Sequence, residues 1–168
     1  MAFVGIIAKK KNQKELEKIK QVVYPHELIY ISQKNLDNMK NIKFETILIQ
    51  DAISMDENLE KIIQNCQYLI INSDSVEWNA DKTKDGLAVI TYGYHFKDTV
   101  TFSSLTEQNI QVCLQRNIQK QTGEWIEPQE ILLQRKQNDE IHSLLEYGTL
   151  KILYREKGDK KVEIEEKQ

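Results

Sequence analysis

The chain has 168 residues, 40% of them hydrophobic and 29% charged, with a formal net charge of −3. These values are typical of one globular domain large enough to bury a core. The 26 acidic and 23 basic residues are mixed along the chain, so no broad positive surface is expected for holding phosphate backbones. The composition therefore argues against a nucleic-acid partner.

The first apolar run, FVGIIA, is short and comes before three lysines. A secretory signal peptide has the opposite order, and a membrane span needs about 20 apolar residues. We therefore expect a cytoplasmic protein with no membrane partner.

Cys66 and Cys113 each lie in or beside an apolar run, which indicates buried thiols in a reducing compartment. A disulfide or a thiol nucleophile is the alternative.

The first 85 residues alternate short apolar runs with amphipathic segments. Asn12 and Glu15 have capping-box spacing before one expected helix, and Ser54 and Glu57 have it before another. Strands that alternate with helices predict right-handed crossovers and a Rossmann-like, doubly wound, largely parallel sheet. Its strands are expected over residues 3–8, 27–32, 44–51 and 68–71.

From residue 86 the chain changes to short runs in which apolar and polar residues alternate. That alternation predicts half-exposed, antiparallel strands that extend the sheet as a flap. Gly123 is expected to turn the chain between two of them. The expected strands are 87–92, 99–105, 110–115 and 130–134.

The C-terminal part is expected to hold a short amphipathic helix over 139–147 and then a hairpin. In that hairpin Ile152 and Tyr154 would face Val162 and Ile164. The predicted fold class is therefore α/β, in one domain. It has an α/β half (1–85), a mostly β half (86–155) and a charged, partly frayed tail (156–168).

Two turns that follow predicted strands hold candidate binding residues. Phosphate cradles are rich in glycine because the backbone amides must approach the ligand, and the turn holding Lys9, Lys10 and Lys11 has none. These lysines are weak anion-binding candidates, with a solvated basic turn as the alternative. Asn72 and Asp74 follow a predicted central strand, at the sheet edge where ligands of doubly wound proteins bind. An Asx-turn that ends the strand is the alternative.

The segment ITYGYHFKDTVTFSSL, residues 90–105, joins two predicted strands and holds the other candidates, Tyr92 and His95. No histidine is spaced with a second ligand as a metal site requires, and no nucleophile motif occurs, so we expect no metal and no catalytic residue.

Trp78 and Trp125 follow polar stretches. Each is interpreted as packed over the end of a sheet or as an anchor for a partner.

The order YLIINSDSVEW, then GLAVITYGYHFKDTVTFSSL, resembles the later half of the central domain of the Mur ligases over roughly residues 66–115. These are ATP-dependent ligases of peptidoglycan synthesis, so the resemblance implies a bacterial protein. Asn72 and Asp74 match the family's Asn-x-Asp-Asp-like motif, with Ser75 at the second acid. Tyr92 and Gly93 match its Tyr-Gly. Asp98 matches the acid of its Ala-Asp, with Lys97 in place of alanine.

The family's phosphate loop, magnesium ligands and C-terminal ligase domain have no counterpart in the sequence, so ligation by this chain is not expected. We expect a non-catalytic Mur-ligase-like module, without a cofactor, that binds a nucleotide, a nucleotide-sugar or a protein partner at an edge formed by Asn72, Asp74, Tyr92 and His95. One alternative is a structural or assembly protein, including a homo-oligomer, that uses exposed β edges. The other is a small enzyme with an unidentified site, for which Asp74 and His95 are the first acid and base to test.

Overall fold

The computed structural model describes residues 2–52, 54–78, 84–136 and 138–155. It divides into two compact units, Met1–Thr91 and Tyr92–Gln168. The fold is α/β, as predicted, with a parallel sheet in the first unit and an antiparallel sheet in the second. Each unit is described by itself below.

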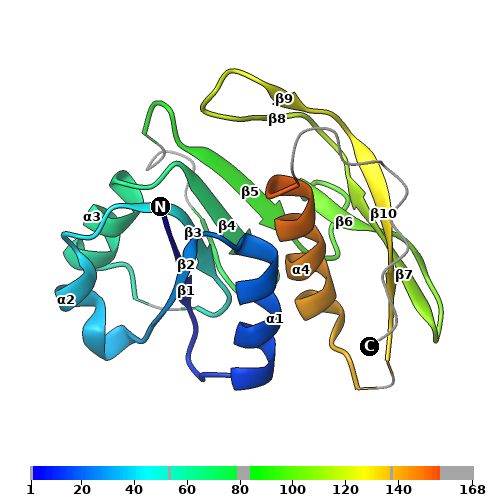
Figure 1. The fold of residues 1–168 in the computed structure, drawn as a ribbon, viewed down its shortest axis with the longest axis horizontal. Coiled ribbons are helices and arrows are strands. Elements are labelled where there is room, and N and C mark those ends of the chain that lie inside the picture. Colours follow the sequence, from blue (N-terminus) through cyan, green and yellow to red (C-terminus); the bar gives the residue numbers. More distant parts are fainter. Residues whose placement is uncertain (1, 53, 79–83, 137, 156–168) are drawn as a thin grey trace. The chain divides into compact units, whose positions relative to one another are not determined.

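The sheet of the first unit has the strand order β2-β1-β3-β4-β5, which is one of the two common orders of doubly wound sheets (Figure 1). Neighbouring pairs β1–β2, β1–β3 and β3–β4 are parallel. These pairings confirm the predicted largely parallel, Rossmann-like sheet. Its strands are β1 (Phe3–Ile7), β2 (Glu27–Ile31), β3 (Phe44–Ile49), β4 (Tyr68–Asn72) and β5 (Ala88–Tyr92).

Helices cover both faces of this sheet. Helix α1 (Gln13–Val23) lies on one face, and α2 (Leu36–Met39) and α3 (Glu57–Gln64) lie on the other, as Figure 1 shows. This arrangement follows from right-handed crossovers, since the chain leaves β1 in one direction and then returns across it from β2 to β3. A 3₁₀ turn (Gln33–Asn35) precedes α2.

The two predicted helix starts have different outcomes. Asn12 caps α1 as predicted, because its side-chain oxygen accepts a hydrogen bond from the amide of Glu15 at 3.2 Å. The prediction that Ser54 caps α3 is wrong. Asp56 is the N-cap, and its carboxylate accepts from the amide of Leu59 at 2.9 Å. Both Ser and Asp are good caps, and helix α3 begins at Glu57, directly after Asp56.

The core on the α2–α3 face of the first unit is made of apolar side chains from four strands and both helices. Alternation along the parallel strands sends every second residue to this face. Phe44, Leu59 and Ile62 are fully buried in it. The partly buried Trp78 and Val76 pack against the same cluster, so the start of the β4–β5 connection is held by apolar contacts.

The second unit contains a three-stranded antiparallel sheet and a small hairpin. Strand β7 (Asn109–Leu114) pairs with β6 (Val100–Leu105) and β10 (Gln129–Gln134), both in antiparallel register, as predicted. Strands β8 (Ile118–Gln119) and β9 (Trp125–Ile126) form the hairpin. Gly123 turns the chain between them with φ +88°, which confirms its predicted role.

One predicted strand pairing is wrong. We expected β5 and β6 to be antiparallel, but Tyr92 pairs with Val100 in parallel register. Only the last residue of β5 and the first of β6 meet, so β6 continues in the direction of β5 after a short loop. This loop, Gly93–Thr99, is called the aromatic loop below.

Helix α4 (Ile141–Leu153) packs against β6, β7 and β10 within the second unit (Figure 1). It is longer than the helix predicted over 139–147, and Ile152 belongs to it. The first strand of the predicted C-terminal hairpin is therefore wrong. The other half of that hairpin and the predicted charged tail, 156–168, lie outside the described residues.

Candidate functional site

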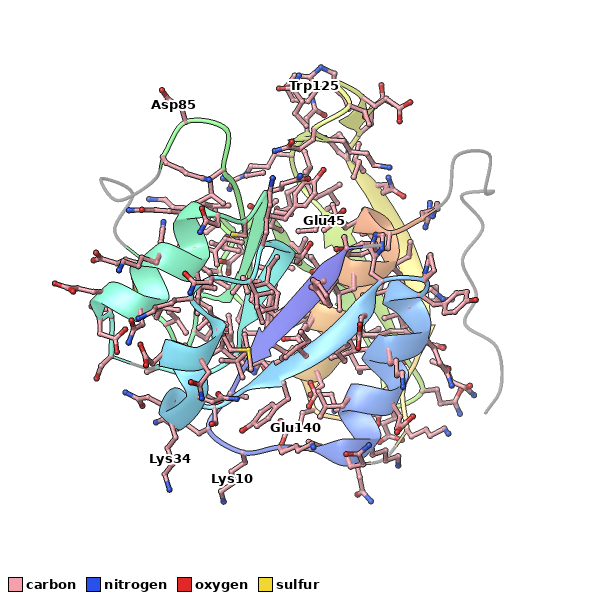
Figure 2. All side chains as sticks on the ribbon, turned by 60° about the vertical axis from the view of Figure 1, so that its left-hand side comes forward. Lys10, Lys34, Glu45, Asp85, Trp125 and Glu140 are labelled. Carbon is pink, nitrogen blue, oxygen red and sulfur yellow. The ribbon has the colours of Figure 1, made fainter. Side chains whose placement is uncertain are left out.

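The carboxyl edge of the parallel sheet is the first candidate site, because the strand order reverses between β1 and β3. Ligands of doubly wound proteins bind where the order reverses, outside the carboxyl ends of the strands. Lys10 follows β1 and Lys34 follows β2, and Figure 2 shows both extending from this end of the first unit. Glu45, at the start of β3, lies at the other end.

The turn after β1 already contains a bound carboxylate from the protein itself. The amide of Lys9 donates a hydrogen bond to Asp51 Oδ2 at 2.8 Å. The side chains of Lys9, Lys10 and Lys11 are exposed, and the Lys11 ammonium lies 6.0 Å from the centre of the Tyr30 ring. Asp51 therefore already binds one backbone amide of this turn.

Asn72 and Asp74 lie together at the carboxyl end of β4. The Asn72 side chain donates to the carbonyl of Gln50 at 3.4 Å and accepts from the amide of Asp74 at 3.1 Å. The second bond defines an Asx-turn, which was the alternative interpretation of this motif. Asn72 is buried and Asp74 is exposed, so the turn presents the Asp74 carboxylate to solvent. Its predicted role in binding a ligand stays a prediction.

The aromatic loop of the second unit has a tightly bonded backbone. The carbonyl oxygens of its residues 95–99 each accept a hydrogen bond. Gln115 donates three of them, from its side chain to the carbonyls of residues 96 and 98 and from its amide to that of residue 99. The Asp98 amide donates to the carbonyl of residue 95, and the Arg116 guanidinium donates to that of residue 97. The buried Asp98 carboxylate also accepts from the amide of His95 at 3.0 Å. Gly93 does not have a positive φ. The loop is shaped by side-chain hydrogen bonds instead of by glycine freedom.

The same loop presents aromatic side chains to solvent. Phe96 is 74% exposed and Tyr94 is 52% exposed. The His95 ring stacks on Phe96 with centroids 4.6 Å apart, and Tyr94 stacks on His142 of α4 at 4.5 Å. The amide of Lys97 donates to His95 Nδ1 at 3.1 Å, which fixes the imidazole orientation.

Tyr92, directly before the loop, is buried, in contrast to the exposed residues 94–97. Its exposed fraction is 1%, and its hydroxyl donates to Glu146 Oε2 at 2.6 Å. Glu146 is equally buried and comes from α4. Sequence reasoning missed Glu146, although a single carboxylate within the apolar run LLEYGTL was a usable signal, since buried acids require hydrogen-bond partners.

The four candidate ligand-binding residues are therefore divided between the units. Asn72 and Asp74 belong to the first unit, and Tyr92 and His95 belong to the second. Within the first unit the structure brings Asn72 and Asp74 together. Within the second it separates the buried Tyr92 ring from the exposed His95.

Among the described residues no group of three or more His, Cys, Asp or Glu side chains is placed to hold a metal ion. His26 Nε2 lies 3.4 Å from Glu45 Oε1. His142 takes part in the aromatic stack with Tyr94.

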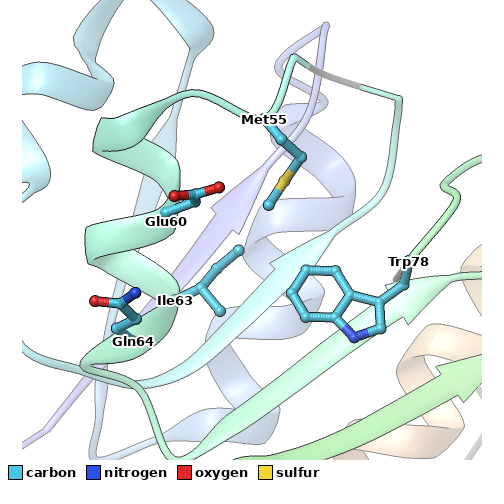
Figure 3. Close-up of a pocket in the computed structure, with 5 residues that line it drawn as sticks. All are labelled: Met55, Glu60, Ile63, Gln64 and Trp78. Carbon is cyan, nitrogen blue, oxygen red and sulfur yellow. The ribbon is translucent and has the colours of Figure 1, made fainter. Parts of the chain in front are cut away.

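A small cavity of about 160 Å³ lies beside α3 in the first unit. Figure 3 shows Trp78 facing α3, with Ile63 extending from the helix toward the indole and Met55 above them, before the helix begins. Glu60 and Gln64 complete the lining. Trp78 is thus packed against the core. Trp125 instead lies exposed on the β8–β9 hairpin, so the packed interpretation is wrong for Trp125.

Both cysteines are free thiols. Burial raises the pKa of Cys66 to about 12, and its thiol donates to the carbonyl of Ile63 at 3.1 Å. Burial, followed by the charge of Glu130, raises the pKa of Cys113. The thiolate is the reactive form, so neither cysteine is suited to act as a nucleophile.

We expect native Cys66 to resist a thiol-specific disulfide reagent at pH 8. A rise in its pKa from 9.0 to about 12 lowers the thiolate fraction about 1,000-fold. Mass spectrometry of the labelled protein should find Cys66 modified only after denaturant is added. Labelling of Cys66 in the native protein at the rate of a free thiol would contradict this expectation.

No helix within the described residues is long and apolar enough to cross a membrane. Comparison with protein-family models and comparison with curated proteins each return no match.

Proposed function

We propose that the protein is a non-catalytic, Mur-ligase-like module of a bacterial cytoplasm that binds a nucleotide or nucleotide-sugar at the carboxyl edge of its parallel sheet. The observation that carries this proposal is the reversal of strand order between β1 and β3, with polar side chains from three strand ends at that edge. A topological reversal of this kind creates a crevice between two loops that diverge to opposite faces.

The geometry of the edge supports recognition of hydroxyl or base groups more than of phosphate. Asp74 is an exposed carboxylate on a fixed turn, and carboxylates at strand ends of doubly wound sheets can accept hydrogen bonds from ribose hydroxyls. Lys9 N is already bonded to Asp51, so the first turn does not offer that amide to a phosphate. We therefore expect the ligand to bind without a phosphate group held at this turn.

A binding role without catalysis is supported by the same contacts. Phosphoryl transfer depends on backbone donors and bound magnesium around the transferred group. The turn after β1 has no glycine, and the Asp51 carboxylate lies at one of its amides. An anion at that amide repels the phosphate oxygens on which such chemistry acts.

The test is a thermal-shift screen with ADP, UDP and UDP-sugars. A ligand present at 100 times its Kd adds about 2.7 kcal/mol to the free energy of unfolding, so a positive shift in Tm is expected. Asp74→Ala should reduce the shift, because it deletes the exposed carboxylate. Asp56→Asn, which retains an N-cap on the same unit, should keep it.

Two outcomes would overturn the proposal. One is the absence of any shift with these compounds at millimolar concentration. The other is a shift that Asp74→Ala leaves unchanged, since the ligand would then bind away from this edge.

A further inference from the structure

The aromatic loop presents an exposed ring already supported on one side. Phe96 is 74% exposed, and the His95 imidazole stacks on it with an angle of 26° between the planes. Exposed aromatic rings of this kind are the surfaces on which nucleobases stack in proteins that bind single nucleotides or strands. Tyr94, the residue before His95, forms a second stacked pair with His142.

The loop is rigid enough to bind without a large ordering cost. Five consecutive carbonyl oxygens, those of residues 95–99, accept hydrogen bonds, and the side chain of Gln115 supplies two of the donors, at 3.0 and 2.7 Å. A pre-organised loop loses little conformational entropy when a ligand binds. Phe96 is therefore held in position by its backbone, although its side chain makes few contacts.

The charge around the ring favours an anionic ligand. Lys97 is exposed and adjacent to Phe96, and the Arg116 guanidinium donates to the Lys97 carbonyl. The loop's carboxylate, Asp98, is buried and is used by the His95 amide. A lysine thus follows the exposed ring in the chain and an arginine contacts the loop backbone, in a protein whose net charge is −3.

We propose that the aromatic loop is a stacking site for the base of a nucleotide, with the base against the open face of Phe96 and its phosphate near Lys97 and Arg116. The choice of nucleotide rests on the proposed function. The site itself is distinct, since it lies wholly in the second unit and uses neither Asn72 nor Asp74.

The experiment is ligand-detected NMR with AMP and ribose 5-phosphate on the full chain. In saturation-transfer spectra the adenine protons of AMP should receive more signal than its ribose protons, and ribose 5-phosphate should bind more weakly. Phe96→Leu should weaken AMP binding about 5- to 150-fold, which is the 1–3 kcal/mol that one stacked base contributes. Phe96→Tyr, which retains the ring, should bind as the wild type does.

Tyr24→Leu is the matched control, because Tyr24 is an exposed aromatic residue of the first unit. It should leave AMP affinity unchanged, and the exposed Phe96 variants should keep the wild-type Tm. AMP binding that survives Phe96→Leu but is lost in Asp74→Ala would overturn the stacking site and leave the edge site standing. AMP binding that is lost in Phe96→Leu but survives in Asp74→Ala would overturn the edge site alone. No binding by the wild type would overturn both sites. A change of oligomeric mass in Phe96→Leu would show a subunit contact and also overturn the stacking site.

Discussion

Replacing Tyr92 with phenylalanine is expected to lower the free energy of unfolding by about 1–3 kcal/mol, the usual cost of removing one partner of a buried hydrogen bond. Tyr92 and Glu146 are each 1% exposed, and their oxygens are 2.6 Å apart. Water cannot replace the lost donor at such a site without a rearrangement. Urea unfolding of the two proteins measures the difference.

A double-mutant cycle separates this hydrogen bond from other effects of the substitutions. Glu146→Leu should also destabilise, because it removes the acceptor of the Tyr92 hydroxyl. The double variant should be less destabilised than the sum of the two single variants, by about 0.5–3 kcal/mol. Simple additivity would contradict the assignment of Tyr92 and Glu146 as an energetically coupled pair.

Replacing Gly148 with alanine is expected to lower the free energy of unfolding by about 1–3 kcal/mol, the usual range for overpacking a core. A Cβ atom at Gly148 would lie 2.9 Å from Val112 Cγ1 and 3.0 Å from Val112 Cγ2. Val112 is fully buried in β7 and has a stiff, branched side chain, so it cannot move aside. The same change on an exposed helix would stabilise by about 1 kcal/mol.

The control for this prediction is the same substitution in a Val112→Ala background. The two methyl contacts are then absent and only the 3.1 Å approach to the Cβ at position 112 is left, so Gly148→Ala should cost clearly less than in the wild-type background. Thermal or urea unfolding of the four proteins measures both steps. An equal cost of Gly148→Ala in the two backgrounds would show that Val112 is not the obstacle.

The first unit was predictable because its local signals agree with its tertiary contacts. Its β1 run is apolar without alternation, as a strand covered by helices on both faces requires, and Asn12 forms the cap that its spacing indicated. The short helix α2, Leu36–Met39, was not predicted. It has a single turn, and four residues are too few to show a helical period.

The C-terminal helix shows why the second unit was harder to predict. Gly148 lowers helix propensity by about 1 kcal/mol relative to alanine, which favoured ending the helix at Tyr147. Gly148 allows α4 to pack closely against Val112. No local pattern encodes this contact, because the two residues are 36 positions apart in the chain. After that early end, the run LKILY was interpreted as a strand, because short apolar runs fit both periods.

The candidate site shows the same division. Residue type and position after a strand located Asn72 and Asp74 at the sheet edge. They did not reveal that Asp51 binds the amide of Lys9, which depends on β3 lying next to β1. Tyr92 and His95 are three residues apart in the sequence, yet one is buried and the other exposed, because the chain leaves the sheet between them.

The most direct test of the proposed binding function is an NMR titration of ¹⁵N-labelled protein with a UDP-sugar. We expect saturable shifts in the amide signals of Ser73, Asp74 and Ser75, at the Asx-turn. Shifts absent from this turn at millimolar ligand, or confined to other parts of the chain, would contradict a ligand site at the carboxyl edge of the parallel sheet.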